Sequence, residues 1–187
     1  MTRAVLALSA GVLACAPIQS GAQNGEPPVS RAATTAQMLA SADVTAGAGN
    51  HRASRKALGT VVEALERIGA RPLEGEEDLV AGWRAQAGPA TAVYRGRVLG
   101  PAYRRGWLEP GGELKLEQLF MGGQQASVAV AATPNQPLRL SVQGADASAQ
   151  CGAAASDCRW TPIFTERYTI RVKNGGAVKT RYYIVFD

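Results

Sequence analysis

The chain has 187 residues, of which 46% are hydrophobic, 19% charged and 6% aromatic, and its formal net charge at pH 7 is +5. This length suits one ordinary domain, or one domain with a small addition. The composition excludes a wholly disordered chain, and no apolar run reaches the roughly 18 residues that a membrane-spanning helix needs. A polytopic membrane protein is therefore excluded, while the composition names no biochemical function.

Residues 1–22 have the organisation of an export signal. Arg3 provides a positive start, an uncharged and mostly apolar stretch of 13 residues runs from Ala4 to Ala16, and Pro17 precedes the small residues Ser20-Gly21-Ala22. We predict cleavage after Ala22. The mature protein, starting at Gln23, would then be periplasmic or secreted.

A second processing route stays open at Val12-Leu13-Ala14-Cys15. This segment is similar to a bacterial lipobox, in which cleavage before the cysteine accompanies acylation of its sulfur. Leu13 is a weak match at the middle position, so the soluble product is favoured. Acylation at Cys15 would instead make an outer-membrane lipoprotein, and it is the only membrane contact that we predict from the sequence.

Either route leaves two cysteines, Cys151 and Cys158, which enclose a loop of eight residues counting both ends. An even pair in an exported chain is most simply a disulfide, worth about 2.5 kcal/mol in the chain-entropy model. A zinc site would need two more nitrogen or sulfur ligands, and His51 is the only histidine. We therefore predict a disulfide, no metal and no cofactor.

The first half of the mature chain has helical periodicity. Residues 23–54 are predicted as a flexible tether with a short helix, and residues 55–93 as a helical annex. A single apolar stripe marks the first annex helix: Leu58, Val61, Val62, Leu65 and Ile68.

A shorter helix is expected from Glu76 to Ala87. Its first turn should hold Glu76, Glu77 and Asp78, where the helix dipole favours acidic groups, while Leu79, Val80 and Trp83 pack inward. Two or three short helices cannot close a core alone, so this half should pack against the residues that follow.

From residue 94 the apolar period changes to two. Alternation is clearest in the runs 113–117, 126–132, 138–142, 168–173 and 182–186, which Gly-, Pro- and Asn-rich turns separate. Several short strands with one apolar face each predict an antiparallel β-sandwich over residues 94–187, with each sheet burying its face against the other. The predicted fold is mainly β, with a small N-terminal helical segment.

Several segments of this half occur in a familiar order: Leu108-Glu109-Pro110-Gly111, Met121-Gly122-Gly123-Gln124, Leu138–Val142, Cys151–Pro162, Arg167–Asn174 and Tyr182–Phe186. The stretch Leu108–Asp187 thereby resembles the bacterial pre-peptidase C-terminal-like domains, which are jelly-roll modules of exported proteins. The resemblance implies a jelly-roll sandwich with a non-catalytic accessory role, and it carries over no active-site residue. Many such domains have an acidic, calcium-suited loop after the third strand, whereas Gly144–Ser148 holds only Asp146.

Candidate catalytic groups are few. A Ser/His/Asp triad would need His51 as its base and Asp43 to orient it, but His51 lies in a Gly-rich segment without a Gly-x-Ser-x-Gly motif. A carboxylate pair could come from Glu109, Glu113 and Glu117, although these positions share the solvated side of a strand. An envelope hydrolase, or a hydrolase subunit, using His51 or such a pair is the alternative function.

The basic excess is mild. Residues 101–187 hold 10 basic and 7 acidic groups, and residues 23–100 hold 9 and 8, which falls short of a groove for a polyanion. Arginines stand next to aromatic residues at several places, a pattern that can stack bases or sugars. In strands, however, neighbours point to opposite faces, which favours aromatic residues inside and arginines outside.

The sequence thus favours an exported, non-enzymatic β-sandwich that binds an envelope protein or polysaccharide, and no nucleic acid. We predict Trp160, Arg159, Tyr103 and Trp107 as its contact region. A third interpretation is a structural protein, in which the N-terminal helices clamp the sandwich or the stripe from Leu58 to Ile68 mediates dimerisation.

Overall fold

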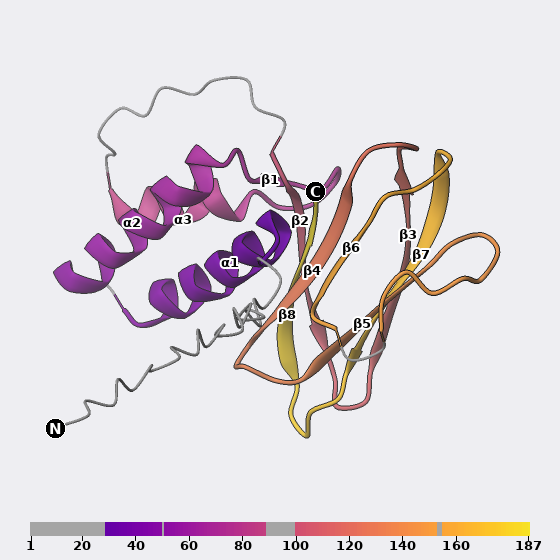
Figure 1. Cartoon of the computed structure of the whole chain (residues 1–187). Helices are drawn as coiled ribbons and strands as arrows, with labels where there is room; N and C mark the ends of the chain where they lie inside the picture. The colour runs from indigo at the N-terminus through magenta and orange to yellow at the C-terminus, as the bar shows by residue number, and fades with distance from the viewer. Residues whose placement is uncertain (1–28, 50, 89–99, 153–154) are drawn as a thin grey trace, which may run out of the picture.

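The computed structural model describes residues 29–49, 51–88, 100–152 and 155–187; the predicted signal peptide and Cys15 lie outside them. Three helices, α1 (Arg31–Gly47), α2 (Arg52–Arg67) and α3 (Leu79–Ala87), come first, with the two-residue strand β1 (Arg71–Pro72) between α2 and α3 (Figure 1). Seven strands follow: β2 (Ala102–Leu108), β3 (Glu113–Phe120), β4 (Ala126–Thr133), β5 (Leu138–Gln143), β6 (Asp157–Trp160), β7 (Glu166–Asn174) and β8 (Thr180–Phe186).

The strands form two sheets. One has five strands in the order β1-β2-β8-β4-β6, and the other has three in the order β3-β7-β5. Neighbouring strands are antiparallel, except that β1 runs parallel to β2. Apolar side chains at alternate positions, such as Val128, Ile170 and Ile184, fill the space between the sheets. The predicted antiparallel sandwich with N-terminal helices is confirmed.

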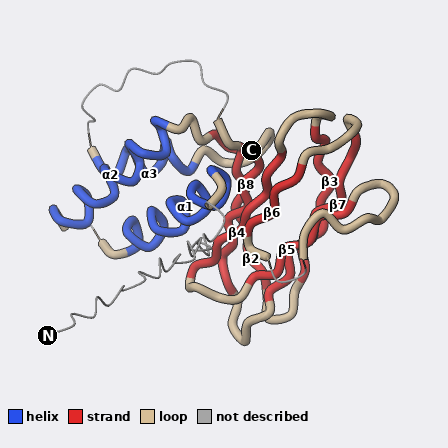
Figure 2. Tube along the Cα trace, viewed as in Figure 1, coloured by secondary structure: helices blue, strands red, loops and turns tan. Residues whose placement is uncertain are grey.

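The three helices cover the other face of the five-stranded sheet, so the molecule has three layers (Figures 1 and 2). Tyr103, Tyr183 and Val185 of the sheet pack there against apolar helix residues that include Leu39 and Trp83. The helices therefore share one hydrophobic core with the sheet, which confirms that they pack against the later half of the chain.

Helix α3 starts later than expected because Asp78 caps it. The Asp78 carboxylate accepts a hydrogen bond of 3.0 Å from the backbone N–H of Ala81, which satisfies a helix-terminal donor. Glu76 and Glu77 precede the helix and bind Arg104 and Arg105 of β2 at 2.9 Å and 2.6 Å. The placement of the three acidic residues in the first turn was wrong, whereas Leu79, Val80 and Trp83 are buried as predicted.

Helix α1 is longer than expected, at 17 residues. Ser30 caps its start: its hydroxyl accepts a 2.9 Å hydrogen bond from the N–H of Ala33 and donates a 2.6 Å bond to Asp157 of β6. Arg31 binds the side chain of the C-terminal residue, Asp187. Near the other end, Asp43 accepts a 2.6 Å bond from Arg181 of β8. Polar contacts at both ends therefore fix α1 to the sheet.

Candidate functional site

Tyr103 does not lie on a contact surface. Its side chain is 0% exposed between the helices and the five-stranded sheet, where its hydroxyl lies 3.2 Å from a carboxylate oxygen of Asp78 and 3.3 Å from the backbone nitrogen of Val80. Burial raises the pKa of this hydroxyl, and the carboxylate of Asp78 raises it further. The prediction of Tyr103 as a contact residue is corrected: it joins the helical layer to the sheet.

The other three predicted contact residues are dispersed. Trp160 is half-buried beside Phe120 and Tyr168, with ring centroids 4.8 Å and 5.1 Å away, and it faces the inter-sheet core. Trp107 is 53% exposed on the opposite face of the same sheet, where the guanidinium of Arg181 lies 4.5 Å from its ring centroid.

Arg159 is exposed and helps to line a shallow hollow with residues such as Val29, Gln125 and Ser127. It alternates along β6 with Cys158 and Trp160, which face the inter-sheet core, so it points to the helix side. Trp160 and Arg159 thus follow the predicted pattern of aromatic side chain inside and arginine outside, and the four residues form no single site.

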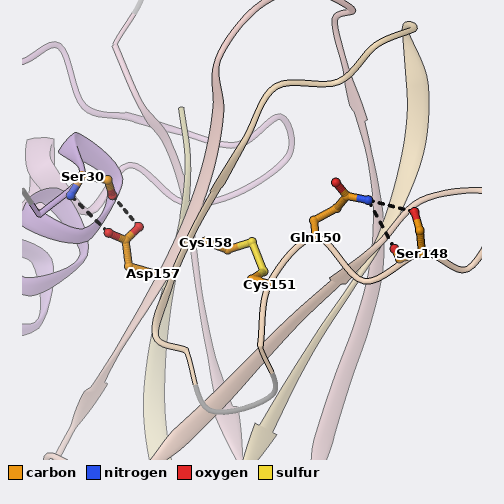
Figure 3. Close-up of a disulfide and its surroundings, with 6 residues drawn as sticks. All are labelled: Ser30, Ser148, Gln150, Cys151, Asp157 and Cys158. Atoms are coloured by element: carbon orange, nitrogen blue, oxygen red, sulfur yellow. Dashed lines mark hydrogen bonds between the residues drawn. A yellow bond between two sulfur atoms is a disulfide. The ribbon is translucent and has the colours of Figure 1, made fainter. Parts of the chain in front are cut away.

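The cysteines are joined, since Cys151 and Cys158 form a disulfide between the β5–β6 connection and β6 (Figure 3). The bridge lies on the edge of the inter-sheet core, where Cys158 is 1% exposed. Close by, Asp157 accepts the two hydrogen bonds from Ser30 that hold the start of α1.

The groups considered for catalysis lie apart. His51 is exposed at the N-cap of α2, and its side chain makes no capping hydrogen bond. Glu109 pairs with Lys179 at 2.6 Å and Glu113 with Arg171 at 2.9 Å, as ordinary surface ion pairs. Within the described ranges, no three His, Cys, Asp or Glu side chains gather in a way that would hold a metal ion. Nor is any described helix long and apolar enough to cross a membrane.

One surface does gather charge: the outer face of the three-stranded sheet, called here the basic face. It faces away from the helices, on the right in Figure 1. Its side chains alternate with core residues such as Leu140, Ile170 and Val172. Five are basic and two acidic, in addition to uncharged ones; the charged residues are Lys115, Arg139, Arg167, Arg171 and Lys173, with Glu113 and Glu117.

The strand register places like charges directly opposite each other on this face. Arg139 of β5 stands opposite Lys173 of β7, whose partner on its other side is Glu113 of β3. In the next outward row, Lys115 of β3 stands opposite Arg171 of β7. Directly opposed side chains are about 5 Å apart at Cβ, and successive outward rows are about 7 Å apart. Like charges at that separation repel, and Glu113, which stands opposite Lys173 and binds Arg171, offsets part of the repulsion in both rows. An anionic ligand would relieve it.

A hollow adjoins the first of these rows. Arg139 and Lys173 line it together with Gly111 and the turn Asn174-Gly175-Gly176, at the end of the sandwich where β7 turns into β8. Two cations thus border a small recess next to a flat, solvated sheet face. This geometry can hold an anionic group in the recess while further groups of the same ligand extend over the next row.

Sequence counting missed this face because it averages over both sides of each strand. Residues 101–187 hold 10 basic groups, and five of them lie on the basic face. The signal was present in the outward positions of three alternating runs, at Lys115, at Arg139, and at Arg171 and Lys173. Only the register shows that the outward positions of these runs meet on one surface.

No family model and no curated protein matches the chain. Several solved structures are partly similar. A periplasmic inhibitor of g-type lysozyme from Aeromonas hydrophila has 12% identity and a TM-score of 0.38, covering 46% of this chain and 84% of the inhibitor. The mitogen of Yersinia pseudotuberculosis has 13% identity and a TM-score of 0.38, covering 48% of this chain and 86% of its own. A de novo designed double-stranded β-helix has 10% identity and a TM-score of 0.30, covering 46% and 97%.

Identities and TM-scores this low assign neither a family nor a partner. The resemblance to pre-peptidase C-terminal-like domains therefore stays a prediction.

Proposed function

We propose that this chain is an exported, non-enzymatic β-sandwich protein that binds an anionic polysaccharide of the cell envelope through the basic face. The observation that carries the proposal is the presence of two directly opposed basic pairs in successive outward rows, Arg139–Lys173 and Lys115–Arg171. A solvated face with a surplus of three cations, two pairs of them in successive rows, suits a linear polymer with repeated anionic groups, because one chain of the polymer can meet both pairs.

Export is supported by the organisation of residues 1–22 and by the Cys151–Cys158 disulfide, since such bridges persist in oxidising compartments. Mass spectrometry of the mature N-terminus tests this part. A chain that starts at Gln23 is the expected product, and an acylated Cys15 would establish the lipoprotein form. A chain that keeps residues 1–22 would contradict export.

Binding is tested with dextran sulfate as the anionic probe and uncharged dextran as its reference. The native protein should bind dextran sulfate with an affinity that falls as salt rises, and it should not bind dextran. R139Q/K173Q should weaken that binding by about tenfold, because two of the five cations and their recess are lost.

R52Q/K56Q is the matched control. It removes the same net charge from exposed positions of α2, away from the basic face, and should leave the affinity within about twofold of the native value. Equal losses in both variants would mean that only the overall charge matters, and the basic face would then not be the site. Trp107 and Arg159, which are exposed elsewhere, stay proposed as separate contact residues.

A further inference from the structure

One end of the sandwich is an apolar tip, defined by Leu119, Met121, Ile163 and Phe164. These side chains are 47%, 53%, 83% and 75% exposed. They come from the end of β3, the β3–β4 turn and the β6–β7 loop, at the upper end of the sandwich in Figure 1. Four large apolar side chains so close together on a surface indicate a contact site, whereas single exposed ones are ordinary.

The two loops are fastened to each other. The backbone N–H of Gly122 donates to the hydroxyl of Thr165 at 3.0 Å, and that of Gly123 donates to the carbonyl of Pro162 at 2.7 Å. A Cβ on Gly122 would lie 2.9 Å from the carbonyl carbon of Phe164, so only glycine permits this approach. The tip is therefore a built element, and its apolar side chains point outward from a fixed backbone.

An aromatic cluster supports the tip from below. The ring centroids of Phe120 and Trp160 are 4.8 Å apart, and those of Phe120 and Tyr168 are 5.8 Å apart, both in edge-on geometry. Phe120 adjoins Leu119 and Met121, and Trp160 leads into the β6–β7 loop. The end of the sandwich is thus already filled, which explains why the tip side chains cannot fold back into the core.

The charge pattern around the tip identifies what it fits. Residues 118–125 and 160–165 contain no charged side chain. Just behind them, Arg159 and Arg167 are balanced in number by Glu117 and Glu166. The surplus cations of the basic face begin one row beyond Glu117, with Lys115 and Arg171. An uncharged apolar end followed by a net basic surface is complementary to a bilayer, where hydrocarbon lies beneath a layer of anionic headgroups.

We propose that the apolar tip inserts into the surface of a bilayer that contains anionic lipid. The tip protrudes, so its side chains can enter a fluid interface without a preformed pocket in the partner. Its two turn N–H groups, on Gly122 and Gly123, already have acceptors within the protein, which lowers the cost of leaving water. The inserting residues are those of the tip and not the Arg139–Lys173 recess, and the contact does not require acylation.

The test measures partition of the exported chain onto phosphatidylglycerol vesicles and phosphatidylcholine vesicles. Every arm carries Cys15→Ser, so that no acyl chain contributes. The native tip should give binding to phosphatidylglycerol vesicles that persists in part at about 0.5 M salt, because insertion of apolar groups is not screened. I163S/F164S should lower the partition coefficient at that salt by about tenfold or more.

V44S/V178S is the matched control, since it also removes two exposed apolar side chains, 58% and 47% exposed, from α1 and the β7–β8 loop. It should leave partition unchanged. Unchanged partition of I163S/F164S, or no binding of the native chain at about 0.5 M salt, would overturn the proposal. Light scattering that shows a dimer dissociated by I163S/F164S would overturn it in favour of a second copy of the chain.

Dextran sulfate binding separates this proposal from the previous one. I163S/F164S should bind dextran sulfate as the native chain does, while R139Q/K173Q should bind it about tenfold more weakly yet retain the salt-resistant part of vesicle binding. A circular dichroism spectrum identical to that of the native chain shows that the substituted loops have not unfolded the sandwich.

Discussion

Strands β7 and β8 lie in different sheets. Their residue patterns show how many faces of each strand are covered by other parts of the protein. In β7, Ile170 and Val172 are buried between the sheets, while Thr169 and Arg171 alternate with them on the solvated side. In β8 the five residues from Tyr182 to Phe186 are all buried. An alternating strand covers one core and a continuous apolar strand covers two.

The comparison teaches that β8 is where the two cores meet. Tyr182, Ile184 and Phe186 enter the core between the sheets, whereas Tyr183 and Val185 enter the core beneath the helices. The helical layer and the sandwich therefore depend on the same strand. A change on the helix side of β8 should loosen the helices, while an equivalent change on the outer side of β7 has no layer above it to disturb.

The largest expected effect comes from placing an aspartate at a buried position of β8, compared with placing one on the outer side of β7. Val185→Asp places a carboxylate in the core beneath the helices at a position that is 0% exposed, and it should cost more than about 4 kcal/mol of unfolding free energy. Thr169→Asp, on the outer side of β7, should change it by no more than about 1 kcal/mol. Urea denaturation followed by circular dichroism measures both. Similar losses would show that the two strands are not covered differently.

A second prediction concerns pH, because burial raises the pKa values of Tyr103 and Tyr183 beneath the helices. Below pH 10 both phenols are protonated whether the chain is folded or unfolded. Above about pH 10 the unfolded chain loses these protons first, so each tyrosine lowers stability by about 1.4 kcal/mol per pH unit.

The unfolding free energy of the native chain should fall as the pH rises above about 10. In Tyr103→Phe this fall should be smaller by about 2 kcal/mol between pH 10 and pH 11.5, because one of the two tyrosines no longer contributes to it. At pH 7 the same variant should lose about 1 kcal/mol, because the hydroxyl no longer bonds near Asp78 and Val80. Urea midpoints across this pH range give the slope. An unchanged slope would mean that Tyr103 already ionises in the folded protein.

A third prediction concerns the junction between the helical layer and the five-stranded sheet. Ser30→Ala removes both the cap of α1 and its bond to Asp157, and should cost about 1–2 kcal/mol. Ser41→Ala, at an exposed position within the same helix, should change stability by less than about 0.5 kcal/mol. Thermal melts of the two variants test this, and equal melting temperatures would remove the role assigned to Ser30.

The sequence allowed the sandwich to be predicted because alternation is a local property. It also contained the signal for the second core, because both faces of the strand carry only aliphatic or aromatic side chains from Tyr182 to Phe186. Assigning one apolar face to the run 182–186 missed the burial of Tyr183 and Val185 on the other face, and hence where the helices sit. The boundary of α3 was missed because a carboxylate in a helical first turn and one at a cap look alike in sequence.

The candidate sites could be predicted less well, because they are made by pairing across the chain. Nothing local tells that Arg139 meets Lys173, or that the β3–β4 turn bonds to the β6–β7 loop. Tyr103 and Trp160 were expected at a contact region because aromatic residues serve both cores and interfaces. Their burial depends on helices and loops that are distant in sequence.

The position of Val29, just before helix α1, has a consequence for attachment. Val29 lines the same hollow as Gln125, which directly follows the turn that carries Met121 of the apolar tip. Cys15 precedes Val29 by 14 positions, a reach of at most about 50 Å. A lipid on that cysteine would hold the tip near the bilayer from the same side. Even a tip with low affinity for lipid would then stay bound to the bilayer, because the attached tip would meet lipid at an effective concentration in the millimolar range.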